Sequence, residues 1–306
     1  MKFNQYKLFL ILCVAISLNA KAQKEANNWY FGNGAGITFN SGSPVPISGS
    51  QLFTTEGCSS ISDANGNLLF YTDGITVWNQ NHLAMPNGNG LNGNVSSTQS
   101  ALIVQKPGSQ NLYYIFVIDI DFRYSIVDMS LQGGLGDVSQ KNSLILAGCA
   151  SEKQCATYHS NGNDIWIMMH TMNSNIFNAY LLTSSGLTMT PVVSTIGMVH
   201  SSPYGQMKFS PNGNRLALGV YNTGPVMELF DFDKSTGLVS NNLPITTTYQ
   251  QCYGLEFSPD NSKLYFAESG NGGGKDSLYQ FDLLAGSPSA ILASGKIVGK
   301  IGRAHV

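Results

Sequence analysis

The first candidate for chemistry is the segment Gly88-Asn89-Gly90-Leu91-Asn92-Gly93, whose glycines have the spacing found in dinucleotide-binding folds. Such glycines hold a pyrophosphate only where they follow a strand and open a helix, because the helix N-terminus supplies the donors. Here Asn94-Val95-Ser96-Ser97-Thr98 follows, which is a loop that leads into a strand. We therefore interpret the segment as a surface loop and expect no cofactor.

Two pairs of aspartates, Asp119 with Asp121 and Asp231 with Asp233, stand at alternate positions, where a strand would point both carboxylates of a pair to one side. A calcium ion needs roughly six to eight oxygen ligands, and nothing near either pair completes such a set. The histidines lack the spacing of metal ligands, and no serine lies in a nucleophile-elbow pattern. We expect neither a metal site nor a catalytic residue.

The two ends of the chain have their own interpretation. Lys2 and Lys7, an apolar run at residues 8–17 and the sequence Ala20-Lys21-Ala22 predict a signal peptide over residues 1–22. The run is too short for a spanning helix, so we expect no membrane span after cleavage and an extracellular or cell-surface protein. Residues 301–306 match the translation of a common sequencing adapter. We interpret them as a non-native tail and expect the natural protein to continue.

Four cysteines remain after the leader: Cys58, Cys149, Cys155 and Cys252. Cys149 and Cys155 are close in sequence, and a disulfide between them could close a small loop in an oxidising compartment. The connectivity stays open, because sequence spacing alone does not fix it. There is no CxxC pair of the kind that binds zinc.

The chain is poor in charge. Charged residues make up 11% of it and the formal net charge is -2, whereas soluble domains average roughly 25% charged residues. A surface of uncharged polar groups does not attract phosphate backbones, so we expect no nucleic-acid partner.

A pattern of a short strand, a tight turn with Asn-Gly character and a second apolar strand recurs along the chain. Asn-Gly between apolar runs indicates a hairpin, because both residues accept a positive φ. Successive turns are roughly 43 to 53 residues apart, a period typical of four-stranded propeller blades. The hairpins lie at residues 58–71, 101–117, 155–168, 207–218 and 255–266.

These repeats predict an all-β protein, a β-propeller of four-stranded antiparallel blades with about five blades visible. Trp29-Tyr30-Phe31 and Ile37-Thr38-Phe39 precede the first hairpin, and we expect these two strands to form the outer part of a closing blade. The ring over residues 23–300 would then be incomplete, and its unpaired edges would make the fragment marginally stable or sticky. A stack of β-sandwiches is the competing architecture, but it would not repeat one hairpin at this period.

Several strings are more specific than the repeat. They are residues 27–40, Glu56-Gly57-Cys58, residues 69–79 and Ser97-Thr98-Gln99-Ser100-Ala101. Together they resemble the N-terminal propeller of large surface proteins that are exported by the type IX secretion system. Those proteins often end in a gliding-motility-associated (type B) sorting domain. The resemblance implies an extracellular or cell-surface location, often with adhesion-type repeats after the propeller, and it implies no catalytic residues.

In a propeller, the segments that enter the inner strands gather around one mouth of the central channel. Here those segments carry Glu56, Gln99, Gln154, His200 and Gln251. A ring rich in amides suits hydrogen bonding to a glycan or to a protein ligand, although the same side chains could merely solvate the loops. We therefore expect a non-enzymatic binding or scaffold module of a larger secreted protein. The alternative is a propeller enzyme, such as a lactonase-like hydrolase, which would need several titratable groups at the mouth.

Overall fold

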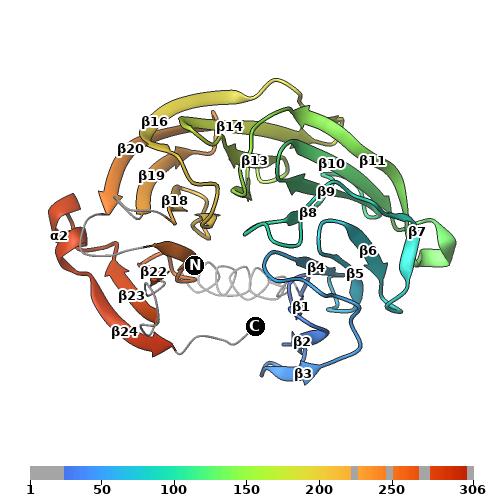
Figure 1. Ribbon diagram of the computed structural model, residues 1–306. Helices are drawn as coiled ribbons and strands as arrows, with labels where there is room; N and C mark the ends of the chain where they lie inside the picture. Colours follow the sequence, from blue (N-terminus) through green and yellow to red (C-terminus); the bar gives the residue numbers. More distant parts are fainter. Residues whose placement is uncertain (1–23, 222–226, 246–250, 269–275, 302–306) are drawn as a thin grey trace, which may run out of the picture.

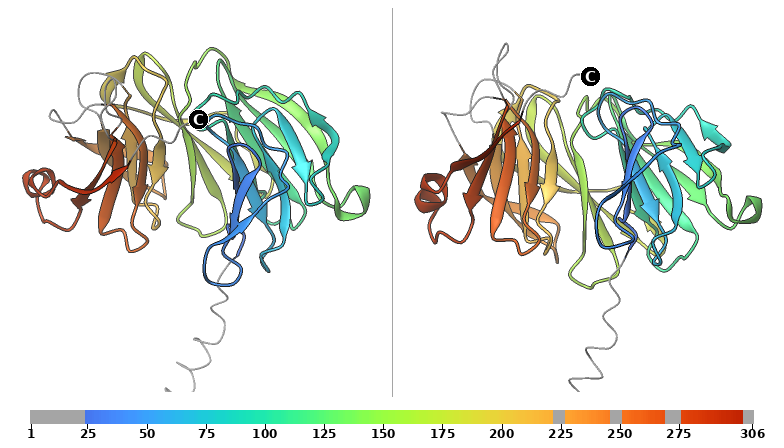
Figure 2. Two further views of the ribbon diagram at one scale, coloured as in Figure 1. Left: turned by 60° about the horizontal axis from the view of Figure 1, so that its bottom comes forward. Right: turned by 90° about the horizontal axis from the view of Figure 1, so that it is seen from below.

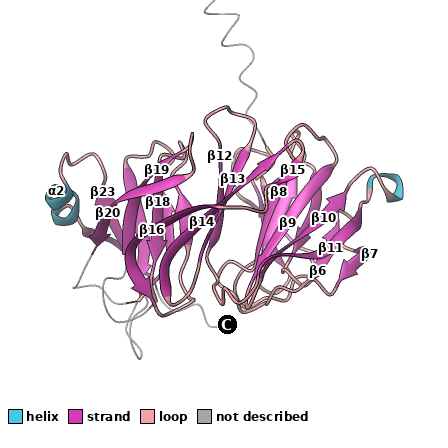
Figure 3. Ribbon diagram, turned by 90° about the horizontal axis from the view of Figure 1, so that it is seen from above, coloured by secondary structure: helices cyan, strands magenta, loops and turns pink. Residues whose placement is uncertain are grey.

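The computed structural model describes residues 24–221, 227–245, 251–268 and 276–301. Within these ranges the regular structure is nearly all β-strand, arranged in six antiparallel sheets (Figure 1 and Figure 3). The helical pieces are the short 3-10 helix η1 (Gln132–Gly134) and α2 (Pro288–Ala293), both at the periphery. The predicted signal peptide and residues 302–306 lie outside the described residues. No described helix has the length and apolar character that crossing a membrane would require.

The first sheet contains β1 (Asn28–Phe31), β2 (Ala35–Thr38) and β3 (Val45–Ile47). The sequence predicts only the first two of these strands, and its expectation that they form the outer part of a blade is wrong for β1, which lies on the inner side of the sheet. The third escapes prediction because Pro46 lies in its middle, where a proline usually argues against a strand. β3 tolerates Pro46 because it is the edge strand and pairs with β2 alone.

The other five sheets each begin at one of the predicted hairpins. The second and third are β4 (Ser59–Ser62), β5 (Leu68–Thr72), β6 (Thr76–Asn79), β7 (Ala84–Asn89), and β8 (Ala101–Gln105), β9 (Leu112–Ile118), β10 (Phe122–Asp128), β11 (Asp137–Leu146). The fourth is β12 (Gln154–Tyr158), β13 (Ile165–His170), β14 (Ser174–Thr183), β15 (Gly186–Leu187) and β16 (Val192–His200), the last two both paired with β14. The fifth and sixth are β17 (Met207–Phe209), β18 (Arg215–Gly219), β19 (Met227–Asp233), β20 (Leu238–Ile245), and β21 (Cys252–Phe257), β22 (Lys263–Glu268), β23 (Asp276–Asp282), β24 (Lys296–Ile301).

The turns that close these hairpins have the geometry their residues predict. Between β17 and β18, Gly213 has φ 72° and its amide donates to the carbonyl of Ser210 at 2.7 Å. Between β21 and β22, Asn261 has φ 63°, and the Ser258 hydroxyl donates to Asp260 at 2.6 Å. Asparagine and glycine accept this left-handed backbone at low cost, so the register of each inner hairpin is fixed locally.

The hydrophobic core is divided into layers, one between each pair of neighbouring sheets. Tyr30 and Tyr71 pack between the first and second sheets, and Phe70 and Ile115 between the second and third. The layers that follow are centred on Phe122 with Tyr180, on Phe177 with Phe230, and on Leu229 with Phe266. Among the described residues, no such cluster joins the sixth sheet to the first.

The sheets therefore succeed one another around an axis as blades, and strands β1, β4, β8, β12, β17 and β21 stand innermost (Figure 1 and Figure 2). The fold is a β-propeller, as the repeats predict, and it has six blades: the five that begin at the predicted hairpins and the three-stranded sheet that precedes them. The first and sixth sheets lie at the two ends of an open arc (Figure 1).

Candidate functional site

The segments that enter the inner strands do converge. The Gly57 amide donates to the Ser97 carbonyl at 3.0 Å, which joins the entries to the second and third blades. The Gln206 amide donates to the Tyr253 carbonyl at 2.9 Å, which joins the entries to the fifth and sixth. We call the set of entry segments, residues 54–58, 95–100, 150–154, 201–206 and 251–253, the axial mouth.

Two of the predicted binding residues, Gln99 and Gln154, lie in the axial mouth, where their side-chain amides form hydrogen bonds with backbone groups of other segments. The Gln99 amide spans two blades, because its oxygen accepts from Met207 N at 2.8 Å and its nitrogen donates to Met207 O at 3.1 Å. Gln154 is buried and donates to the carbonyls of Gln99 (2.8 Å) and Phe116 (3.3 Å). Gln99 therefore links the third blade to the fifth and Gln154 links the fourth to the third, while Gln154 Oε1 is buried without a partner. Their predicted role in binding remains a prediction.

The structure adds a buried carboxylate that sequence reasoning missed. Glu152, only 8% exposed, accepts hydrogen bonds at Oε2 from the backbone amide (2.7 Å) and the hydroxyl (2.8 Å) of Thr98. The contact crosses from the fourth blade to the third, and the Gly205 amide in turn donates to the same hydroxyl at 3.4 Å. The available signal was the charged doublet Glu152-Lys153 directly before an inner strand, in a chain that has few charges.

The second member of that doublet is a buried lysine. Lys153 is 1% exposed, and its Nζ donates to the carbonyls of Ser202 (3.3 Å), Pro203 (2.6 Å) and Tyr204 (2.5 Å). Burial lowers the pKa of Lys153 to about 7, partly offset by the nearby charge of Glu152. The side chain thus fastens the entry segment of the fifth blade to that of the fourth.

Glu56 and Tyr253 bring unpartnered polar atoms to the same mouth from the second and sixth blades. The Tyr253 hydroxyl lies close enough to Glu56 and Thr98 for both to influence its pKa, which burial raises. Yet neither that hydroxyl nor Glu56 Oε2, both buried, completes a hydrogen bond with acceptable geometry. Burial is also the main cause of a raised pKa of Glu56, and the charge of Glu152 adds to it. Both atoms are shut off from solvent and lie beside one another, so Glu56 and Tyr253 join the second blade to the sixth at the mouth.

Aromatic rings stand beside these groups. Tyr221 makes an edge-to-face contact with Tyr253 (centroids 5.9 Å apart, 87°) and another with Tyr204 (6.2 Å, 84°). Tyr204 is 45% exposed. The axial mouth therefore combines carboxylates with tyrosine faces.

The remaining predicted residues are placed differently. His200 is buried at the end of β16, where its Nε2 meets Glu228 Oε2 on β19 at 2.6 Å, between the outer parts of the fourth and fifth blades. Its ring lies 4.7 Å from that of His170. Gln251 lies just before β21 with φ 56°, in the axial mouth. His200 is therefore not brought together with Glu56, Gln99 and Gln154.

The predicted disulfide between Cys149 and Cys155 is not formed. Both cysteines carry free thiols, and they belong to different core layers, Cys149 with Phe122 and Cys155 with Trp166. The two cysteines are six positions apart in the sequence. Between them the chain crosses from one side of the fourth blade to the other, so their thiols lie in separate layers.

The other sequence candidates have structural roles. Asp121 pairs with Arg123 at 2.5 Å and accepts from the Gly148 amide at 2.9 Å. Asp233 accepts from Ser235 N (2.8 Å) in the turn after β19. The glycine-rich segment forms the end of β7 and the loop that follows. Among the described residues, no group of three or more histidine, cysteine or acidic side chains is arranged to hold a metal ion.

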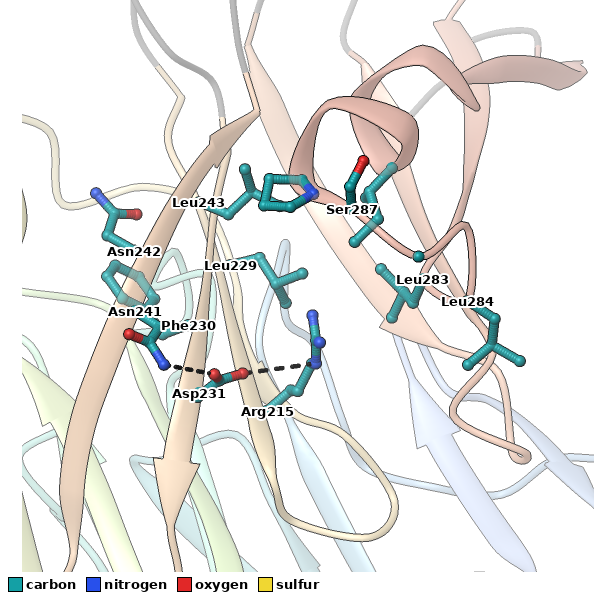
Figure 4. A pocket seen from close by; sticks show the side chains of 13 residues that line it. Arg215, Leu229, Phe230, Asp231, Asn241, Asn242, Leu243, Leu283, Leu284 and Ser287 are labelled. Carbon is teal, nitrogen blue, oxygen red and sulfur yellow. Dashed lines mark hydrogen bonds and ion pairs between the residues drawn. The ribbon is translucent and has the colours of Figure 1, made fainter.

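Among the described residues, the hollows that are lined lie away from the axial mouth, and the two most spacious are of similar size. One, of about 650 Å³, lies between the fifth and sixth blades at the periphery, with apolar walls and the pair Arg215–Asp231 at one end (Figure 4). Its charges already satisfy one another, because Arg215 Nε lies 3.7 Å from Asp231 Oδ1 and Asn241 donates to Asp231 at 2.9 Å. The other, of about 690 Å³, is at the opposite end of the inner strands, among the hairpin turns, and includes Glu25.

Comparison with known proteins supports the fold. No family model matches the chain, and no curated protein matches it. Among solved structures, a candidate 6-phosphogluconolactonase from Bacteroides fragilis is similar, with a TM-score of 0.51 at 12% identity over 88% of this chain and 77% of that one. A candidate 6-phosphogluconolactonase from Bacteroides uniformis gives a TM-score of 0.51 at 14% identity over 88% and 78%. At such identities the likeness concerns the propeller architecture, and function must be argued from the site.

Proposed function

We propose that this chain is a non-enzymatic binding module and that its ligand-binding surface is the axial mouth. The observation that carries the proposal is the convergence of Glu56, Glu152 and Tyr253 from three different blades, beside the tyrosine rings of the mouth. Concave sites with a few convergent polar groups and aromatic walls are typical of ligand recognition.

Catalysis is disfavoured by the state of the reactive groups near the mouth. Burial raises the pKa of the Cys252 thiol to about 12 and that of Cys58 to about 11, so neither is a thiolate at neutral pH. Lys153 directs its Nζ to three carbonyls and is not free to act as a base. An activated nucleophile with a base in hydrogen-bond reach is therefore not found among the described residues of the mouth.

A lactonase-like hydrolase is the second candidate, and one observation favours it. Glu56 and Glu152 are two carboxylates in different settings, one with a raised pKa, as in sites that divide acid and base roles. A phosphorylated lactone is a poor substrate for this mouth. The Lys153 ammonium is already bonded to backbone carbonyls, and the other charged side chains of the mouth are carboxylates, which repel phosphate.

The partner is proposed to be a glycan or a protein at the cell surface. The resemblance of residues 27–40 and 69–79 to type IX-exported propellers supports export and an adhesion-related role.

The test separates binding from catalysis. The purified protein is screened against an array of neutral glycans, amino glycans and peptides, and in parallel for hydrolysis of simple lactones. We expect saturable binding that is lost in Tyr253→Phe and no lactone turnover above that of Glu56→Gln. Turnover that depends on Glu56 would replace the binding proposal by the hydrolase.

A further inference from the structure

Two histidines are buried side by side between the fourth and fifth blades. His170 ends β13 and His200 ends β16; each is 1% exposed, and their rings lie 4.7 Å apart. Each ring has one buried nitrogen, Nε2 of His170 and Nδ1 of His200, that meets no hydrogen-bond partner among the described residues. Phe177 closes another side of the His170 ring at 4.8 Å. The pair is therefore enclosed and only partly hydrogen-bonded.

The surroundings of His170 oppose a positive charge on its ring. The titratable groups that face it are His200, from β16, and Lys153, from the entry segment of the fourth blade. The nearby carboxylates are engaged elsewhere, because Glu228 of β19 pairs with His200 at 2.6 Å and Glu152 accepts hydrogen bonds from the third blade. A proton on His170 would be buried beside other cationic groups, so the closed fold excludes it.

Lys153 connects this histidine pair to the axial mouth. Its carbonyl accepts from the His170 amide at 3.4 Å, and its Nζ donates to the carbonyls of residues 202–204. Those residues belong to the segment 201–206 of the axial mouth, which directly follows His200 in the chain. The segment is thus attached to the histidine pair at its start and to the Lys153 ammonium along its length. We call residues 201–206 the latch.

Given the proposed binding function, we infer that the latch is acid-sensitive: it closes the axial mouth at neutral pH and is released when His170 takes up a proton. Water reaches the His170 ring when the end of β16 and the latch move away, and the ring then accepts its proton in a hydrated setting. The charged ring also repels the Lys153 ammonium, whose hydrogen bonds hold the latch. Release gives ligands access to a mouth whose buried polar atoms are shut off from solvent in the closed state.

The direction of the effect follows from proton linkage. The closed fold holds the pKa of His170 well below its usual value of about 6.5, mainly because the ring is buried. The open latch therefore binds a proton below about pH 6.5 that the closed latch does not, and acid favours opening. One such histidine raises the opening constant about twentyfold between pH 7 and pH 5. Because apparent affinity scales with the open fraction, a ligand of the mouth gains up to about the same factor at pH 5.

The test measures the opening of the latch by thiol labelling. Cys252 is fully buried, and its carbonyl would lie 3.1 Å from a Cβ on Gly205 of the latch, so its thiol reports on the movement of that segment. Cys149 is equally buried, between the third and fourth blades, and is the internal control. The unaltered protein is labelled with an aromatic disulfide at pH 7 and pH 5, and the modified cysteines are identified by mass spectrometry. Rates are divided by those of the urea-unfolded chain at the same pH, which removes the chemistry of the thiol itself.

We expect the protection of Cys252 to fall about twentyfold from pH 7 to pH 5 while that of Cys149 stays unchanged. His170→Gln should abolish the fall, and His159→Gln, at the turn before β13, should retain it. An equal fall at both thiols would mean global unfolding, and a fall that persists in His170→Gln would assign the proton to another group. Either result would overturn the inference. Because labelling needs no ligand, a mouth that binds nothing would refute the proposed function and leave the latch as measured.

Discussion

At the scale of single residues, the axial mouth is held together by side chains that bond across blade boundaries, such as Gln99 to Met207 and Gln154 to Gln99. The sequence placed Glu56, Gln99 and Gln154 in the segments that enter the inner strands, and the structure confirms their location. Their roles depend on which neighbour each amide finds across a blade boundary. Tyr253 was missed because its place beside Glu56, which comes from another blade, follows only from the assembled ring.

Lys153 gives the first residue-scale prediction. Replacement by methionine keeps the stem but leaves three carbonyls without their donor, so we expect Lys153→Met to lower the free energy of unfolding by about 3 kcal/mol. Urea denaturation measures the change. Lys208→Met is the control: Lys208 is partly exposed and makes a single ion pair with Glu256 at 3.0 Å, so its loss should cost less than about 1 kcal/mol. Equal losses in the two variants would refute a special role for Lys153.

Gln99 gives the second residue-scale prediction. Gln99→Leu removes the two bonds to Met207 and leaves backbone groups of the fifth blade unpaired, so we expect a loss of about 2 kcal/mol. Gln105→Leu is the comparison, because Gln105 bonds only to carbonyls of its own exposed turn. If Gln99→Leu is as stable as Gln105→Leu, the amide is not a clamp and is free to bind ligand.

At the scale of elements, hairpins were predictable because their turns are encoded locally. Asn-Gly and Ser-Pro-Asp segments set the register of β17 with β18 and of β21 with β22. Strands β3 and β15 could not be predicted in this way, since their pairing depends on the strands beside them rather than on their own residues. For the same reason the layer between the fourth and fifth blades could not be foreseen from the isolated strands.

That layer contains the third prediction. His170 on β13 is buried against Phe177 and His200, and burial together with the charges of His200 and Lys153 holds its pKa well below the usual value. Below about pH 6.5 His170 is therefore protonated in the unfolded chain but stays neutral in the folded protein. The free energy of unfolding consequently falls as the pH drops through that range. The groups that face His170 are His200, paired with Glu228, and the buried Lys153.

The measurement is the urea midpoint at pH 7 and at pH 5. We expect His170→Gln to lose less stability than the unaltered protein between these two values, because the variant has no proton to exclude at that position. His159→Gln, at the turn before β13, is the control and should retain the full acid dependence. An unchanged pH dependence in His170→Gln would show that another group is responsible.

At the scale of the whole molecule, the open arc leaves apolar side chains of the first sheet uncovered. Trp29, Phe31 and Phe53 of the first sheet and the segment after it are 51%, 39% and 72% exposed. In the other blades, residues at comparable positions pack against a neighbouring sheet. The sequence predicted the blade repeat and the unmatched strands, but not how much apolar surface those strands would leave uncovered, because burial is a property of the assembled ring.

This surface gives the fourth prediction. Residues 23–300 should associate with themselves at micromolar concentration, and the double variant Trp29→Ser with Phe53→Ser should shift the chain toward monomer in analytical ultracentrifugation. Leu83→Ser is the control, since Leu83 is 63% exposed but stands alone between β6 and β7. A monodisperse, cooperatively folding monomer without any substitution would contradict the expectation.

The central claim is that ligands bind where the entry segments of the inner strands meet. One array of glycans and peptides, probed with Glu56→Gln, Tyr253→Phe and Glu25→Gln beside the unaltered protein, tests it most directly. The account predicts that every ligand bound by the unaltered protein is lost or weakened at least tenfold in the first two variants and retained in the third. Binding that survives both axial substitutions, or that disappears with Glu25→Gln, would place the site elsewhere on the propeller and contradict the account.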